Sequence, residues 1–148
     1  MIRLATLDDI PEIARLGAVF HEQAGWVEIP YIEADCAASL SAFMDMPNFI
    51  SLVSDDGGIN GMISGITSPV YFNHAHTSGE ELFWWVDETA PQMVGVKLLK
   101  ALENEAKSRG VATWQMKSLA RLGGERMVKL YERLGYRASE RTFIKELV

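Results

Sequence analysis

Hydrophobic and polar residues along the chain follow two periods, one of about two residues and one of three to four. The opening "MIRLA" alternates and predicts a short strand. From about Leu7 to Gln23 the apolar residues recur three and four apart, which predicts a helix with one buried face. A weaker helix is predicted from about Ile32 to Met44, before Pro47. The first third of the chain is therefore predicted to form a strand followed by two helices.

The next segment has the pattern of a β-hairpin. "NFISLVS" and "INGMISGITS" are apolar alternating runs, and the "DDGG" between them supplies residues that accept a positive φ. Gly61 and Gly65 interrupt the second run. Such glycines weaken a strand but permit a bulge or the close approach of another chain or ligand.

The rest of the chain alternates extended segments and helices. We expect a crossover loop with some extended character at "SPVYFNHAHTSG", an aromatic strand at "EELFWWV" and a strongly patterned helix at "VGVKLLKALENEAKS". We then expect a strand at "VATWQMKS", a helix at "ERMVKLYERLG" and a closing strand at "YRASERTFIKELV". Strand–helix–strand units that follow an early hairpin predict a mixed α/β fold.

Composition narrows the classes of partner. A chain of 148 residues predicts a single domain over residues 1–148. Its 14 basic and 20 acidic residues give a net charge of −6, which disfavours nucleic acid and anionic lipid as partners. The sequence has neither an export signal nor a long apolar run, so we expect a cytoplasmic protein that does not enter a membrane. Cys36 is the only cysteine, so no intrachain disulfide can form.

Specific residues coincide with this order of elements. A strand that ends in Val86 leads through a turn into a helix with Leu98-Leu99, and "LYERLGY" stands near the C-terminus. Over nearly its whole length the chain resembles the GNAT family of N-acetyltransferases, and it looks like the small bacterial or bacteriophage members. The resemblance implies an α/β fold with a mixed, mostly antiparallel central sheet of six or seven strands flanked by about four helices.

The turn before Leu98-Leu99 corresponds to the family's binding site for the pyrophosphate of acetyl-CoA. A helix N-terminus offers unpaired N–H groups and a partial positive charge to such an anion. Gly95 keeps a family glycine, whereas Met93 stands where a glycine is common. The residues that the resemblance assigns to this contact are Gln92, Met93, Val94, Gly95, Val96 and Lys97. The alternative is that Pro91 and Gly95 only shape the start of a helix.

Two more segments are implied to touch the coenzyme. The strand before the turn would pair with the pantetheine arm through the backbone of Phe83, Trp84, Trp85 and Val86. Gly124 lies where many members place an asparagine that contacts the coenzyme. The side chains of Trp84 and Trp85 point to opposite sides of their strand, so one is predicted in the core and the other at a cleft or subunit interface.

Acetyl transfer to an amine needs a base for the amine and a proton for the departing thiolate. Glu81, at the start of the aromatic strand, is the predicted base; alternatively, Glu80 and Glu81 are solvated charges at a strand end. Tyr131 matches the family tyrosine that protonates the coenzyme sulfur, so it is the predicted acid. Its alternative role is a core tyrosine whose hydroxyl is bonded to backbone.

The acceptor site is predicted from the segments that vary within the family. These segments contain His21, Trp26, Tyr71 and His74, which we expect to contact the acceptor. His74 and His76 would lie on one side of an extended strand, but no cysteine or third ligand accompanies them, so no metal is predicted. Solvated loop histidines are the alternative.

The sequence thus predicts an N-acetyltransferase that moves the acetyl group of acetyl-CoA to a primary amine by direct attack. The acceptor is a small molecule or a protein. The alternative is a binding or interaction protein of the same fold with weak or lost catalysis. Either a monomer or a homodimer, joined through the last strand or the sheet edge, is compatible with the sequence.

Overall fold

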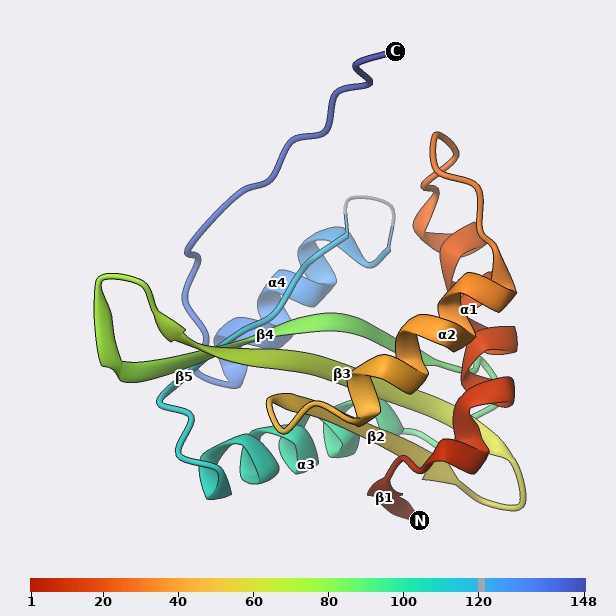
Figure 1. Ribbon diagram of the computed structural model, residues 1–148, viewed down its shortest axis with the longest axis horizontal. Helices are drawn as coiled ribbons and strands as arrows, with labels where there is room; N and C mark the ends of the chain where they lie inside the picture. The colour runs from red at the N-terminus through yellow and green to blue at the C-terminus, as the bar shows by residue number, and fades with distance from the viewer. Residues whose placement is uncertain (120–121) are drawn as a thin grey trace.

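The computed structural model describes residues 1–119 and 122–148, and it places one β-sheet between two pairs of helices (Figure 1). The elements are β1 (Ile2–Leu4), the short 3-10 helix η1 (Leu7–Asp9), α1 (Ile10–Ala24), α2 (Glu33–Met44), β2 (Phe49–Asp55), β3 (Ile59–Val70), β4 (Asn73–Val86), α3 (Val94–Ser108), β5 (Thr113–Gln115) and α4 (Gly124–Arg133). The four α-helices lie where the hydrophobic periodicity predicts them. In the described part of the chain, no helix has the length and apolar character needed to cross a membrane.

The strands lie in the sheet in sequence order, β1-β2-β3-β4-β5. The first four are antiparallel to their neighbours, and β5 runs parallel to β4 after the crossover through α3. The expected mixed, mostly antiparallel sheet and the hairpin of β2 and β3 are therefore present. The described residues form five strands, however, and not the six or seven that the resemblance implied.

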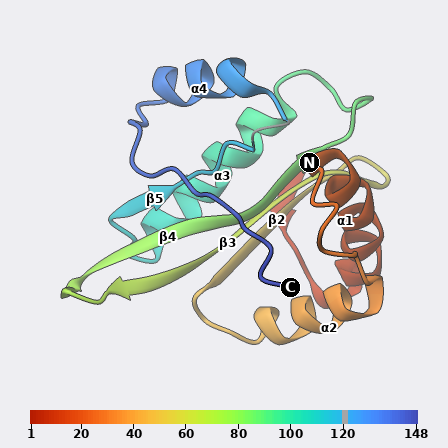
Figure 2. The same cartoon turned by 90° about the horizontal axis from the view of Figure 1, so that it is seen from above.

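Helices cover both faces of the sheet, α1 and α2 on one and α3 and α4 on the other (Figure 2). Side chains alternate along a strand, so β2 and β3 each contribute to two cores. Val53 and Met62 face α1 and α2, whereas Ile50 and Ile63 face α3. The apolar stripe of α3 is fully covered, since Leu98, Leu99 and Leu102 are 0% exposed.

An ion-pair network holds the start of the chain to the sheet. The Arg3 guanidinium donates to both carboxylate oxygens of Asp9, at 2.7 and 2.8 Å, and to Oδ2 of Asp55 at 2.7 Å. The Asp9 carboxylate also accepts the backbone N–H of Thr6 at 2.7 Å. Hydrogen bonds from Arg3 lower the pKa of Asp9 to about 2 against the opposing effect of burial. The network therefore fixes the turn between β1 and α1.

The segment predicted as a crossover loop is instead a β-hairpin. Residues 68–70 and 73–79 belong to β3 and β4, which pair antiparallel as far as Val70 and Asn73. The tip consists of Tyr71 and Phe72, which are 88% and 77% exposed. No glycine or asparagine pair marks this turn, and Pro69 cannot donate to a strand ladder, so the sequence lacked the usual hairpin signal. The pairing register is irregular at Pro69, which accommodates the proline.

The closing strand predicted from Tyr136 is absent. Residues 136–148 contain no helix or strand, and they lead away from the body of the protein (Figure 1). Four large apolar side chains are exposed there: Phe143, Ile144, Leu147 and Val148. Alternating apolar residues form a strand only beside a partner edge, and this segment leaves the free edge of β5 unpaired.

Two glycines allow an aromatic ring to lie flat on the sheet. A Cβ atom at Gly65 would come within 2.5 Å of the Trp114 ring, and Gly79 on the next strand lies still closer to it. The strand register shifts between Ser64 and Gly65. The bulge or close approach that the sequence predicts at Gly65 is therefore present, and the approaching group is the indole of β5.

Candidate active site

The candidate active site lies where β4 and β5 separate. Their parallel pairing begins at Ser78 with Thr113 and ends at Glu80 with Gln115, although β4 continues to Val86. Beyond this point, the backbone N–H of Lys117 donates to Glu81 Oε2 at 3.0 Å. At the end of the β4–β5 pairing, the Glu81 carboxylate thus accepts a backbone hydrogen bond from Lys117. The following residues of β4 have an edge that β5 does not cover.

Glu81 is a buried carboxyl group, only 6% exposed. Burial raises its pKa to about 7, and the hydrogen bond from the Lys117 amide opposes that rise only in part. Among the described residues, nothing donates to its second oxygen, Oε1. A carboxyl group that titrates near neutral pH and has a free oxygen is suited to take up a proton in a reaction.

Tyr131 reaches the backbone of the same residue, Lys117, from α4. Its hydroxyl donates to the carbonyl oxygen of Lys117 at 2.7 Å. The side chain is 8% exposed, and burial, followed by the charge of Glu81, raises the pKa of the phenol. The hydroxyl therefore keeps its proton at neutral pH. The two predicted catalytic side chains are brought together on the backbone of Lys117, one at its nitrogen and one at its oxygen.

Trp84 and Trp85 face opposite sides of β4, as their adjacent positions predict. Trp85 is the core residue, since it is 6% exposed on the α1 face and donates from Nε1 to Gln23 at 3.2 Å. Trp84 faces α3 and α4, with its ring centroid 6.2 Å from that of Tyr131. Its buried Nε1 has no hydrogen-bond partner among the described residues. Only Trp84 can therefore present its side chain on the α3 side, and Trp85 can contribute only backbone there.

The start of α3 has the geometry of a site for an anion. Met93, the N-cap residue, has φ 70°, and no side chain caps the helix. Within the described ranges it is the one non-glycine residue in the left-handed region. The N–H of Val94 donates to Pro91 at 3.3 Å, whereas those of Gly95 and Val96 have no acceptor among the described residues. Unpaired N–H groups at a helix start can bind a phosphate oxygen.

Three side chains around this turn face solvent. Gln92, Met93 and Lys97 are exposed, and Lys97 is the basic residue of the first turn of α3. Gly95 allows close packing, because a Cβ there would come 3.2 Å from the ring of Trp84, tighter than an ordinary van der Waals contact. The glycine therefore lets α3 approach the uncovered part of β4.

Gly124 begins α4, and both it and Gly123 have positive φ, 39° and 82°. A Cβ at Gly124 would meet no atom within 4 Å. The glycine at this position therefore leaves open space at the start of α4, on the side of the sheet that carries Tyr131.

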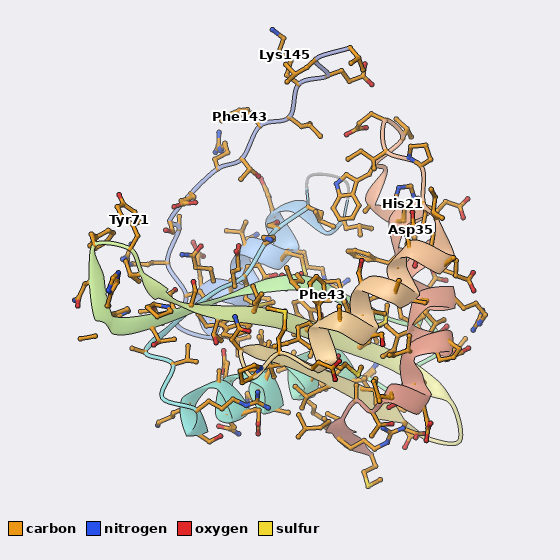
Figure 3. The ribbon with its side chains drawn as sticks, in the orientation of Figure 1. His21, Asp35, Phe43, Tyr71, Phe143 and Lys145 are labelled. Atoms are coloured by element: carbon orange, nitrogen blue, oxygen red, sulfur yellow. The ribbon has the colours of Figure 1, made fainter. Side chains whose placement is uncertain are left out.

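The four residues expected at the acceptor lie in two separate places. Figure 3 shows one residue of each place, His21 and Tyr71. His21 and Trp26 line a cavity of about 170 Å³ between the α1 face and β4. Tyr71 and His74 belong to the β3–β4 hairpin at the other end of the molecule, and both are exposed. His76 contacts Thr113 Oγ1 at 3.0 Å, and no group of three metal-ligating side chains occurs in the described residues.

Sequence reasoning missed Lys117 and Leu82. Lys117 acts through its backbone, and a backbone contact has no signature in residue type. Leu82 lies in a bulge, because Ser64 pairs with Phe83 and the adjacent Gly65 pairs with Glu81. Gly65 was the available signal, since a glycine within a strand marks such irregularities.

Comparison with known proteins identifies the family. The model of the acetyltransferase (GNAT) family matches residues 12–136. No curated protein sequence matches the chain significantly.

Solved structures share the fold along its whole length. A predicted acetyltransferase with acetyl-CoA from Clostridium acetobutylicum has a TM-score of 0.79 at 16% identity, over 99% of this chain and 96% of that one. The ribosomal-protein-alanine N-acetyltransferase of Brucella melitensis has a TM-score of 0.74 at 17% identity, over 99% and 98%. An aminoglycoside acetyltransferase from an uncultured soil sample has 0.75 at 15%, over 100% and 98%. At these identities the likeness shows the fold alone.

Proposed function

The chain belongs to the acetyltransferase (GNAT) family, and we propose that it transfers the acetyl group of acetyl-CoA to a primary amine. The observation that carries the proposal is that Glu81 and Tyr131 both bond to the backbone of Lys117, Glu81 to its N–H and Tyr131 to its carbonyl oxygen. A base and an acid are thereby held together at the point where the sheet opens.

The start of α3 and the uncovered part of β4 are the proposed seat of acetyl-CoA. The N–H groups of Gly95 and Val96 would bind the pyrophosphate, and Lys97 would add positive charge. The uncovered backbone of Trp84 and Val86 would pair with the amide groups of the pantetheine arm, as one strand pairs with another. Trp84 Nε1, buried without a partner, is one more donor on this side of β4.

Direct attack by the amine gives a role to both Glu81 and Tyr131. An alkylamine with a pKa of about 10 is mostly protonated at neutral pH, so it must lose a proton before its nitrogen can attack. Glu81 takes that proton. The nitrogen–carbon bond to the acetyl group forms, the carbon–sulfur bond breaks, and the nitrogen gives its second proton to solvent to become the amide. Tyr131 gives its hydroxyl proton to the sulfur and regains one from solvent. Rotation of the hydroxyl about its carbon–oxygen bond turns the hydrogen from Lys117 toward the sulfur.

The proposal is tested by acetyl transfer from acetyl-CoA to a panel of primary amines, for the native protein, Glu81→Gln and Tyr131→Phe. Each variant should lower kcat by about 10²-fold or more, because each removes one proton transfer. For the native protein, kcat/KM calculated on the protonated amine should rise with pH and level off above about 7, as Glu81 ionises. Glu81→Gln should abolish this rise. Full activity in both variants would refute the assigned roles.

A coenzyme-binding protein without catalysis is the second candidate. Met93 favours it, because a side chain in the left-handed region occupies the place where a family glycine is common. The hydrogen bond of Tyr131 to Lys117 favours it as well, since it is the bond expected of a structural tyrosine. Binding of acetyl-CoA without transfer to any amine of the panel would support this second candidate.

A further inference from the structure

The cavity of about 170 Å³ on the α1 face has an apolar lining. Aromatic and aliphatic side chains dominate it: Phe20, Trp26, Phe83, Ile13, Met62 and Leu82. Phe20 and Trp26 meet edge to face, with ring centroids 5.6 Å apart. No Asp, Glu, Lys or Arg is among the described residues that line it. A second charged group on a ligand would therefore find no counter-ion inside this cavity.

Two polar side chains at the cavity have hydrogen-bond partners. The hydroxyl of Tyr31 donates to the carbonyl oxygen of Ala14 at 2.5 Å. His21 Nε2 lies 2.6 Å from the carbonyl oxygen of Ile29, which ties the segment between α1 and α2 to α1. Buried polar groups that have partners gain nothing from a polar ligand, whereas an apolar group would be removed from water. The lining therefore favours a hydrophobic ligand group.

The size of the cavity matches one aromatic ring. An apolar cavity of about 150 Å³ lined by Leu, Ile and Phe is large enough to bind benzene. A cavity of about 170 Å³ accommodates a ring and leaves little room for a second one.

The cavity borders the bulge of β4, next to the residue that carries the proposed base. Leu82, the residue without a partner on β3, and the next residue, Phe83, both line the cavity. Leu82 directly follows Glu81, the proposed base. A ligand group in the cavity would thus lie beside the same stretch of β4 that carries the reaction.

We infer that the acceptor is a primary amine with a single aromatic ring, or an alkyl group of that size, bound in this cavity. The inference rests on the proposed function and names its class of substrate. It excludes polyamines and other acceptors whose far end is charged. Tyr71 and His74 take no part in this recognition, because they lie on the distant hairpin.

The experiment compares 2-phenylethylamine with ethylamine, which lacks the ring, and with 1,4-diaminobutane, which has a second ammonium group. Burial of a ring predicts a kcat/KM for 2-phenylethylamine that is about 10-fold to 100-fold higher than for the other two. Cys36→Phe, which fills the cavity from α2, should remove this advantage. Val27→Ala is the matched control, since Val27 follows Trp26 but is 81% exposed and outside the lining.

A second variant tests the inference even if Cys36→Phe does not fold. Trp26→Ala enlarges the cavity from an exposed segment, so it should shift preference toward 2-(1-naphthyl)ethylamine by about 10-fold relative to 2-phenylethylamine. Equal use of the three amines, or a preference for 1,4-diaminobutane, would overturn the inference while the proposed function stood.

Calorimetric titration of 2-phenylethylamine, with and without CoA, separates the two claims. Binding that Cys36→Phe abolishes, in a protein that transfers acetyl to no amine, would keep the cavity as a ligand site and refute the proposed function. Absence of binding under both conditions would overturn the inference directly.

Discussion

At the scale of single residues, burial distinguishes two side chains of the same type by their pKa. Glu80 and Glu81 are neighbours of the same type, yet Glu80 is exposed and pairs with Lys117 Nζ at 3.6 Å, whereas Glu81 is buried with a raised pKa. The choice of Glu81 and Tyr131 could be made from their positions in the chain. Their joint contact with Lys117 could not, because it depends on where β5 leaves β4.

Burial of Glu81 has a consequence for stability that can be measured without any substrate. Its pKa in the folded protein, about 7, lies above the ordinary value of 4.5, so its protonated form is favoured by folding. That stabilisation is complete below pH 4.5 and is lost as pH rises through 7. Glu81→Gln, which cannot ionise, should therefore be more stable than the native protein at pH 8 by about 1 to 3 kcal/mol. Denaturant unfolding at pH 5 and pH 8 measures this, and a less stable variant at pH 8 would contradict it.

Asp9 has the opposite dependence on pH. Its pKa of about 2 lies below the ordinary 3.8 because Arg3 holds the ionised form. The stabilisation is present above about pH 4 and is lost as pH falls toward 2. Asp9→Asn should cost about 1 to 2 kcal/mol at pH 7 and progressively less below pH 4. Glu12→Gln, which breaks an exposed pair with Arg15, is the control and should change stability much less. Equal costs in the two variants would show that the Arg3 network has no special role.

At the scale of elements, periodicity predicts helices well and strand partners poorly. α3 follows its apolar stripe closely, because the stripe itself is what packs against β2 and β3. The β3–β4 hairpin was missed and a closing strand was wrongly predicted, both for the same reason. A strand is stable only when it pairs with a neighbouring strand. The residues near Tyr71 and those after Tyr136 do not show from their own sequence whether such a partner is present.

The start of α3 gives a prediction for this element alone. Met93→Gly should keep stability within about 1 kcal/mol of the native protein, because relief of the left-handed backbone offsets the flexibility that glycine adds to the unfolded chain. It should tighten CoA binding several-fold, since the Cβ no longer limits approach to the helix start. Met93→Ala, which keeps the Cβ, is the control and should show a smaller gain in calorimetry. Weaker binding by Met93→Gly would mean that the methionine side chain itself contacts the ligand.

At the scale of the whole molecule, the fold places the proposed sites on opposite faces of one strand. Figure 2 shows α3 and α4 on one side of the sheet and α1 and α2 on the other. The proposed coenzyme seat lies on the α3 side, and the cavity proposed for the acceptor is lined by residues of α1, α2 and β4. The family resemblance supplied the fold and the coenzyme segments as expectations, but it did not predict that the two sites lie on opposite faces of β4. The identity of the acceptor could not come from the same source, because the cavity is built from residues that only the folded chain brings together.

The segment after Tyr136 makes no stabilising contact of its own in this arrangement. Phe143 is 88% and Leu147 is 89% exposed, so little apolar surface is buried there. Deletion of residues 140–148 should therefore change the free energy of unfolding by less than about 0.5 kcal/mol. Thermal unfolding of the full and shortened chains at equal concentration measures this. A fall in Tm of several degrees would show that the segment is docked in solution, either on its own chain or on a second copy.

Calorimetric titration of the native protein with acetyl-CoA tests the central claim most directly. The claim is that the start of α3 and the uncovered part of β4 form a binding site for acetyl-CoA. Because the N–H groups of Gly95 and Val96 are already positioned, we predict one site with a Kd in the micromolar range. No heat of binding at millimolar acetyl-CoA would contradict the account, whatever the fold.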